Sequence, residues 1–266
     1  MIPASFSYVK PSSLGEAISA ASGEEAKVIA GGQSLLPLLR LRLAYPDLLV
    51  DVGGLSELRG VSDDGSSLVI GALTTHDELI RDPLIGAWCG LLAQAASTVA
   101  DPAVRHRGTI GGSLANNDPA ADYPAAALGL GATIKTNKRS IPADDYFTGM
   151  FSTALEQDEI ITEVEFPVPE KAGYEKFRNP ASRYAIVGVF VAKFPSGVRV
   201  AVTGAGQGGV YRQTEMEQAL TANFAPDAVA NIKTSPDGMN GDIHASAEYR
   251  AHLVGVIAKR AVAKAA

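Results

Sequence analysis

The order of apolar and polar residues predicts short strands alternating with helices in the first part of the chain. The apolar runs 27–30 and 48–52 have the length of buried strands, and each is followed by a pair of glycines. Between them, the run 35–43 is long and apolar enough to form a helix. An earlier helix is expected to begin after Ser13, because Glu16 stands three residues further on, the spacing of a capping box. This alternation predicts an α/β fold.

The same pattern extends through the middle of the chain. A hairpin is predicted over 58–72, with an Asp-Asp-Gly sequence as its turn. A second capped helix is expected to begin after Thr75, and a third helix, rich in alanine, over 87–99. Two further strands are predicted at 133–136 and 160–166.

A domain boundary is expected where Pro167 and Pro169 end the last of these strands, because proline cannot donate a ladder hydrogen bond. The chain is therefore divided into two expected domains, 1–168 and 173–266. Antiparallel strands with trailing helices predict a small α+β unit for the second domain. The elements expected there are two strands and two helices, at 185–194, 198–203, 213–221 and 247–265.

Composition narrows the classes of function. Twenty-nine acidic residues against 23 basic ones give a net charge of -6, which provides no general attraction for nucleic acid or for an anionic membrane. No segment approaches the ~18 apolar residues of a membrane span, and a cytoplasmic location is expected. Cys89 is the only cysteine, so this chain cannot supply the four thiolates of a usual iron–sulfur cluster. The apolar neighbours of Cys89 predict core packing.

Two glycine turns are the strongest chemical signals in the sequence. Residues 31–34 (GGQS) and 109–113 (TIGGS) each follow an apolar segment and combine a glycine pair with hydroxyl side chains. Without Cβ atoms, the main chain can approach a phosphate closely, and consecutive amides can form an anion-binding concavity. One such turn alone is more simply explained as a tight connection between a strand and a helix. Two of them predict a clamp around one dinucleotide.

A third glycine-rich segment, Gly204–Gly209, matches the G-x-G-x-x-G pattern of a Rossmann dinucleotide site. Only 57 residues follow Gly209, which is too few for a full nucleotide-binding sheet. No strand that ends in an acidic residue lies about 20 residues further on, as that site requires. We interpret the segment as a loop of the small domain.

The paired motifs resemble a known family. The stretch 30–37 (AGGQSLLP), taken with 108–112 (GTIGG), resembles the FAD pyrophosphate signatures of the flavoprotein subunit of carbon monoxide dehydrogenase and its relatives, including the flavin domain of xanthine dehydrogenase. The resemblance spans nearly the whole chain, since 6–13 is similar to the family's opening and 245–250, with 259–261, to its last helix.

This resemblance implies an FAD-binding domain of the vanillyl-alcohol oxidase (PCMH) type. Such a domain has two α/β subdomains, is followed by a C-terminal α+β flavoprotein domain, and holds an extended FAD. By motif position, the resemblance assigns FAD contacts to Ile29, Ala30, Gly31, Gly32, Gln33, Ser34, Leu35, Thr109, Ile110, Gly111, Gly112, Ser113, Asp122, Ile161, Arg178 and Tyr184.

The resemblance also implies separate roles for the isolated positions. Asp122 would lie near the nucleotide portion, Ile161 near the adenine or the ring, and Arg178 near the flavin. Tyr184 would cover the isoalloxazine, although a half-buried strand tyrosine is the simpler alternative. Ser113 departs from the family, since many relatives carry Asn or Asp there, and Arg178 replaces a common Lys and so changes the shape of the cation.

The family's division of labour implies two partners. A large subunit with a molybdenum cofactor would oxidise the substrate, and a small subunit with two [2Fe–2S] clusters would carry electrons to the FAD of this chain, in a dimer of heterotrimers. The external acceptor would then take the electrons from the flavin. Two alternatives stay open at this point: a self-contained FAD oxidoreductase of the same fold, and a nucleotide-sensing module without enzymatic activity.

Overall fold

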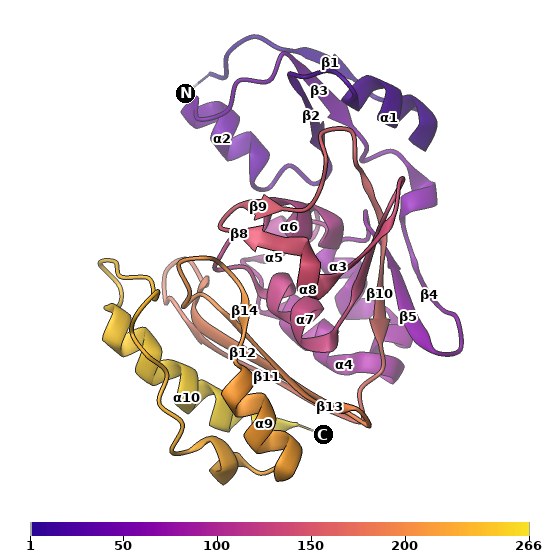
Figure 1. The fold of residues 1–266 in the computed structure, drawn as a ribbon. Helices are drawn as coiled ribbons and strands as arrows, with labels where there is room; N and C mark the ends of the chain where they lie inside the picture. The colour runs from indigo at the N-terminus through magenta and orange to yellow at the C-terminus, as the bar shows by residue number, and fades with distance from the viewer. Residues whose placement is uncertain (1, 266) are drawn as a thin grey trace.

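The structure is a computed structural model that describes residues 2–265. Its N-terminal layer is a small parallel sheet in the order β1-β3-β2, with two helices beside it (Figure 1). Ser13 caps the first helix, as predicted, by accepting the amide hydrogen of Glu16. The elements of this layer are β1 (Ser7–Val9), α1 (Leu14–Ala21), β2 (Ala26–Ile29), α2 (Leu35–Leu41) and β3 (Leu48–Asp51).

The middle layer is built on an antiparallel sheet in the order β4-β5-β10-β6-β7. Its strands are β4 (Val61–Asp63), β5 (Ser67–Gly71), β6 (Thr133–Thr136), β7 (Ser140–Pro142) and β10 (Ile161–Pro167). The helices and the short hairpin of this layer are η1 (Ser56–Leu58), α3 (His76–Arg81), α4 (Pro83–Ser97), α5 (Pro102–Arg105), α6 (Ile110–Asn116), α7 (Asp122–Leu130), α8 (Ala143–Tyr146), β8 (Phe147–Gly149) and β9 (Ser152–Thr153).

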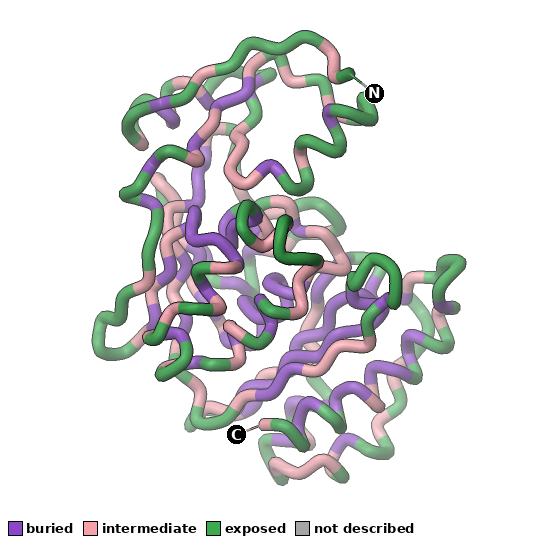
Figure 2. Tube along the Cα trace, turned by 180° about the vertical axis from the view of Figure 1, so that it is seen from behind, coloured by how far each residue is buried: buried purple, intermediate pink, exposed green. Residues whose placement is uncertain are grey.

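The C-terminal layer is a four-stranded antiparallel sheet in the order β11-β12-β13-β14. One face of this sheet packs on α7, and α9 and α10 cover the other (Figure 1). Residues 185–192 of the central strand are all buried for this reason, which appears as a purple run in Figure 2. The elements are β11 (Lys171–Arg178), β12 (Ala185–Phe194), β13 (Gly197–Thr203), β14 (Tyr211–Arg212), α9 (Thr214–Ala222), η2 (Pro226–Val229) and α10 (Ala247–Lys264). Within residues 2–265, no helix combines the length and apolar character needed to cross a membrane.

The mixed α/β architecture confirms the predicted fold class, while several element boundaries differ from the expectation. The alanine-rich helix begins at Pro83, because the side chain of Asp82 accepts hydrogen bonds from the amides of Leu84 (2.9 Å) and Ile85 (3.4 Å). Cys89 is buried in this helix, as predicted, at a kink where its backbone leaves the helical region. The strands β11 and β14 were not predicted.

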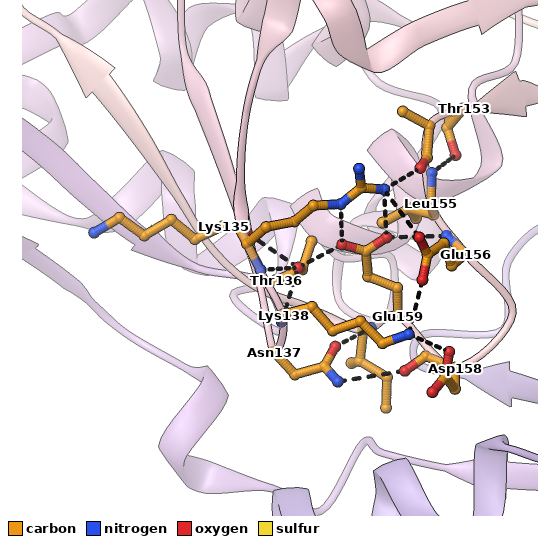
Figure 3. Close-up of polar contacts among 12 residues, drawn as sticks. Lys135, Thr136, Asn137, Lys138, Thr153, Leu155, Glu156, Asp158 and Glu159 are labelled. Carbon is orange, nitrogen blue, oxygen red and sulfur yellow. Dashed lines mark hydrogen bonds and ion pairs between the residues drawn. The ribbon is translucent and has the colours of Figure 1, made fainter.

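A buried carboxylate fixes the entry into β10 (Figure 3). Glu159 lies two residues before the start of this strand, and its side chain is inaccessible to solvent. The carboxylate joins the β6–β7 hairpin to the segment before β10, and Lys138 extends the network by pairing with Glu156 (2.8 Å) and Asp158 (2.6 Å). Glu159 accepts hydrogen bonds from Arg139 Nε (2.9 Å), Arg139 Nη2 (3.0 Å), Thr136 Oγ1 (2.7 Å) and the amide of Glu156 (2.9 Å).

We predict that Glu159 contributes stability that is lost in acid. The hydrogen bond from Arg139, helped by the Glu156 amide and Thr136, lowers the pKa of Glu159 from 4.5 to about 2. Because the folded pKa lies below the unfolded one, the contribution is present above about pH 5 and lost as the pH falls toward 2. Glu159→Gln should lower the unfolding free energy by about 2 kcal/mol at pH 7 and flatten its pH dependence between pH 5 and 2.

Urea unfolding at a series of pH values measures this effect. Glu170→Gln is the matched control, because Glu170 pairs with Lys193 at 3.0 Å on the surface and both side chains are more than a third exposed. A surface pair of this kind contributes at most about 1 kcal/mol. Equal losses in the two variants would contradict a special role for Glu159.

Candidate functional site

The structure brings the two predicted glycine turns into main-chain contact. Gly31, which follows β2, lies against the residues that precede the second turn. A Cβ atom on Gly31 would collide with the carbonyl oxygen of Arg107 and come within 2.9 Å of Gly108 Cα. Only glycine fits this approach, so the sequence requires glycine here to join two layers that are distant in the chain.

The first turn has main-chain amides that are not used in hydrogen bonds within the described part of the chain. Among the hydrogen bonds within residues 2–265, none is donated by the amides of Gly31, Gly32, Gln33 or Ser34. Gly32 has φ 72°, a conformation that L-residues rarely adopt, and Gln33 and Ser34 are exposed. Successive amides without an internal partner are the groups that bind an anion such as a phosphate.

The second turn differs from the expectation, because its amides have partners within the chain. What it presents to solvent is the surface of Gly112 and the part-exposed Ser113. Gly111 is needed for packing, since its Cβ would lie 2.8 Å from the carbonyl oxygen of Ala72. The donated bonds run from Ile110 N to Thr74 O (3.1 Å), from Gly111 N to Ala72 O (2.9 Å), from Gly112 N to Thr109 Oγ1 (3.1 Å) and from Ser113 N to Thr109 O (3.0 Å).

An uncharged histidine, His76, packs against Gly108, directly before the second turn. His76 is only 5% exposed. Its ring lies 5.1 Å from that of Tyr123, and a Cβ on Gly108 would come within 2.6 Å of its Nε2. Burial, followed by the nearby charge of Arg105, lowers the pKa of His76 to about 4. The imidazole is therefore uncharged at neutral pH.

Ile161 is connected to the second turn through the segment that follows β5. It is buried at the start of β10, and the carbonyl of the next residue, Thr162, accepts the Ala72 amide at 2.9 Å. The carbonyl of Ala72 in turn accepts the amide of Gly111. Ile161 thus belongs to the apolar support of the turn in this structure.

Asp122 begins α7 and is buried together with two residues of β11. Tyr174 donates to its Oδ1, and Lys176 Nζ lies 2.9 Å from its Oδ2. Lys176 also donates to the carbonyl oxygen of Thr98 at the end of α4 (3.3 Å). Burial and the Asp122 charge raise the pKa of Tyr174 well above its ordinary value. This ion pair joins the middle and C-terminal layers.

Arg178 and Tyr184 lie close to each other, at the end of β11 and just before β12. Both are exposed, and a cavity of about 400 Å³ is lined by Arg178, Pro180 and Arg183. Arg183, which the sequence did not single out, adopts φ 64° and donates to the carbonyl oxygen of Ala100 (2.8 Å). Its signal in the sequence was only its place beside Tyr184.

The third glycine-rich segment has no Rossmann geometry. It follows β13, but a two-residue strand comes next in place of a helix. The amide of Gln207 donates to the carbonyl of Gly238 (2.8 Å), and the amide of Gly209 donates to that of Gly206 (3.2 Å). The segment is therefore a folded loop of the C-terminal layer, as the sequence indicated.

Comparison with known proteins identifies the family. Residues 4–169 match the family model described as "FAD binding domain in molybdopterin dehydrogenase". Over 98% of its length the chain is 36% identical to the carbon monoxide dehydrogenase medium chain of Hydrogenophaga pseudoflava, and the match covers 97% of that protein. The chain belongs to the FAD-binding medium subunits of the molybdenum hydroxylase family.

Other relatives of this medium subunit extend the picture. The nicotine 6-hydroxylase medium subunit of Paenarthrobacter nicotinovorans is 35% identical, with 97% of this chain and 96% of the relative covered. The structure of carbon monoxide dehydrogenase from Hydrogenophaga pseudoflava superposes with a TM-score of 0.88 at 36% identity, covering 99% of this chain and 98% of that one. This chain is an oxidoreductase subunit, and its cofactor is FAD.

The residues present fit this cofactor. FAD carries a pyrophosphate, which needs hydrogen-bond donors, and the first turn has amides that donate to no acceptor within residues 2–265. The contact between Gly31 and Arg107 places the exposed surface of Gly112 in a turn adjoining these amides. Ser34 and Ser113 add hydroxyl groups on the two sides.

We predict that Lys176→Met destabilises this medium subunit severely. The substitution would leave the buried carboxylate of Asp122 without its cation, and breaking a buried pair in this way costs about 3–5 kcal/mol. The double variant Asp122→Asn/Lys176→Met removes both charges and should recover most of the loss. Chemical denaturation followed by circular dichroism gives both values.

Lys264→Met is the control for this pair. Lys264 contacts Glu175, a neighbour of Lys176 on β11, but its side chain is 55% exposed. Its loss should change the unfolding free energy by less than about 1 kcal/mol. The prediction fails if the double variant is as unstable as Lys176→Met.

Proposed function

We propose that this chain is an electron relay, in which FAD takes electrons from [2Fe–2S] clusters of a partner subunit and passes them to an external acceptor. The observation that carries the proposal is the contact between two glycine turns, one of which has four amides without a partner in residues 2–265. When bound, FAD supplies the ability to take up electrons singly and release them as a pair. The protein binds the cofactor, orients it and shields it.

In the proposed pyrophosphate site, the first turn provides most of the hydrogen-bond donors, and the second turn provides a surface of fixed shape. The open amides of 31–34 and the hydroxyl of Ser34 donate to phosphate oxygens, with Ser113 donating from the opposite turn. The occupied amides of the second turn hold its surface fixed. The full set of proposed FAD contacts is Ile29, Ala30, Gly31, Gly32, Gln33, Ser34, Leu35, Thr109, Ile110, Gly111, Gly112, Ser113, Asp122, Ile161, Arg178 and Tyr184.

The flavin end of the cofactor is assigned to the C-terminal layer. Arg178 brings a positive charge to the surface beside Tyr184, whose phenol is half exposed. We assign residues 1–168 to an FAD-binding domain and 173–266 to a C-terminal domain, whose strand β11 begins at Lys171, just before this range. The cofactor then extends from the glycine turns toward the second domain.

Two partner subunits complete the proposed enzyme. Cys89 is buried and its pKa is raised to about 11, so it is neither a thiolate nor accessible to a cluster. Iron–sulfur clusters and the substrate-oxidising molybdenum cofactor must then belong to other chains. We propose a small [2Fe–2S] subunit and a large molybdenum subunit, assembled as a dimer of heterotrimers.

Gly112→Asp tests the cofactor site. We expect it to abolish FAD binding, because a carboxylate about 4 Å from a phosphate repels it by roughly 4 kcal/mol near a surface. That energy corresponds to about a thousandfold loss of affinity. Gly112 is the best position, since an added Cβ meets only Thr109 Oγ1, at 2.8 Å, whereas Gly31 has no room and Gly32 has φ 72°. Flavin absorbance after gel filtration of the folded variant measures the loss.

The control is Gly208→Asp, in the glycine-rich segment that resembles a Rossmann motif. An added Cβ on Gly208 meets no atom within 4 Å, whereas one on Gly206 would press on Tyr211 at 2.9 Å. Gly208→Asp should keep its FAD. Loss of flavin from Gly208→Asp alone would mean that the cofactor site has been assigned to the wrong loop.

We also predict that the chain alone binds FAD without a covalent bond and does not oxidise the organic substrate. Acid precipitation should release FAD, and not FMN, into the supernatant, because two turns fit a pyrophosphate better than a single phosphate. Substrate oxidation should appear only when molybdenum and iron–sulfur subunits are present. Turnover by the chain alone at the rate of the complex would instead support a self-contained flavoenzyme.

A further inference from the structure

Phe151 stands at a strained and exposed position. It lies between β8 and β9 with φ 53°, a conformation that is unfavourable for a bulky L-residue, and it is 59% exposed. Glycine or asparagine would suit this backbone better. Strain of this kind persists where the surrounding structure enforces it, and it is concentrated at functional sites.

Asn117 holds the conformation of the β8–β9 tip, residues 150–151. It is fully buried, and its Nδ2 donates to the carbonyl oxygens of Gly149 (2.8 Å) and Ser152 (2.8 Å). The main-chain carbonyl oxygen of Asn117 accepts a hydrogen bond from the amide of Phe151 (3.2 Å). Asn117 caps the C-terminal end of α6 with φ 42°, so the tip is tied to the helix that begins at the second glycine turn.

The C-terminal domain reaches the segment that follows α6. The amide of Ala185 donates to the carbonyl of Ala120 (3.4 Å), and the amide of Gly204 donates to that of Pro119 (2.8 Å). Tyr184, directly before Ala185, is 51% exposed. Phe151 is therefore held at the C-cap of α6, and Tyr184 adjoins a residue bonded to the segment directly after that cap.

We propose that Phe151 contacts the flavin ring of FAD and forms the wall opposite Tyr184. This inference rests on the proposed function, in which the pyrophosphate lies at the glycine turns. A cofactor that runs from the start of α6 toward the C-terminal domain passes the far end of the helix, about 10 Å away for its seven residues. Aromatic faces stack on ring systems, which explains a strained phenylalanine where a turn residue would fold more easily.

Phe151→Asn and Phe151→Tyr test the proposal in the full chain. Asparagine accepts the left-handed backbone, so Phe151→Asn should raise the melting temperature of the FAD-free protein by about 2 °C. Loss of the ring should weaken FAD binding about tenfold and alter the visible circular dichroism of the bound flavin. Phe151→Tyr keeps the ring and should restore both flavin properties.

Arg42→Gly is the matched control. Arg42 also has a left-handed backbone, φ 57°, but caps the end of α2 that is remote from the glycine turn. It should gain stability without any change in FAD affinity or flavin spectrum.

Two results would overturn the proposal. One is a Phe151→Asn variant whose FAD affinity stays within twofold of the parent and whose flavin spectrum is unchanged. The other is an unchanged flavin together with loss of co-purifying subunits, which would assign the tip to a partner surface. In either case FAD loss from Gly112→Asp would leave the proposed function standing, whereas an unmodified chain that binds no FAD would remove the function itself.

Discussion

The burial of α7 between two sheets is the constraint on which the rest of the structure depends. All nine of its residues, Asp122–Leu130, are buried, with α4, α6 and β10 of the middle layer on one side and β12 and β13 on the other. Small residues make this possible, since a Cβ on Gly129 would come within 2.8 Å of the Phe190 ring. A helix that is apolar on every side can be stable only in such a position. The relative placement of the middle and C-terminal layers follows from it.

This packing connects the arrangement of the middle and C-terminal layers to the second glycine turn. Lys176 and Arg183, both from the C-terminal layer, donate to the carbonyls of Thr98 and Ala100, on either side of a bend where Ala100 has φ 39°. Arg105 holds the same bend from α5, just before the second glycine turn. The second turn is thus supported through cations from the middle and the C-terminal layers. Displacement of the C-terminal layer would break the bonds from Lys176 and Arg183 to the bend and so remove part of the support of the second turn.

Local signals in the sequence predicted much of the fold and picked out the two glycine turns that the structure brings together. The capping residues Ser13 and Thr75 were identified correctly, because a cap depends on neighbours three residues away. The paired turns were recognisable because close main-chain approach demands glycine. What could not be predicted was set by contacts between distant residues. The burial of His76 depends on Gly108, and the amides of Ile110 and Gly111 are bonded to carbonyls in the segment after β5. Asn117 carried no pattern that would reveal its hold on the β8–β9 tip.

The unequal state of the two glycine turns has a consequence for how a ligand is recognised. A turn whose amides are already bonded presents a fixed shape, and it loses little conformational entropy when a ligand arrives. The first turn, whose amides of 31–34 donate no hydrogen bond within residues 2–265, can adjust to phosphate oxygens but must be ordered as it does so. Main-chain amides bind negatively charged oxygens and do not distinguish between ligands that differ elsewhere in their structure. Selection of one dinucleotide over other phosphate esters must therefore come from the rigid turn and from the surfaces beyond it.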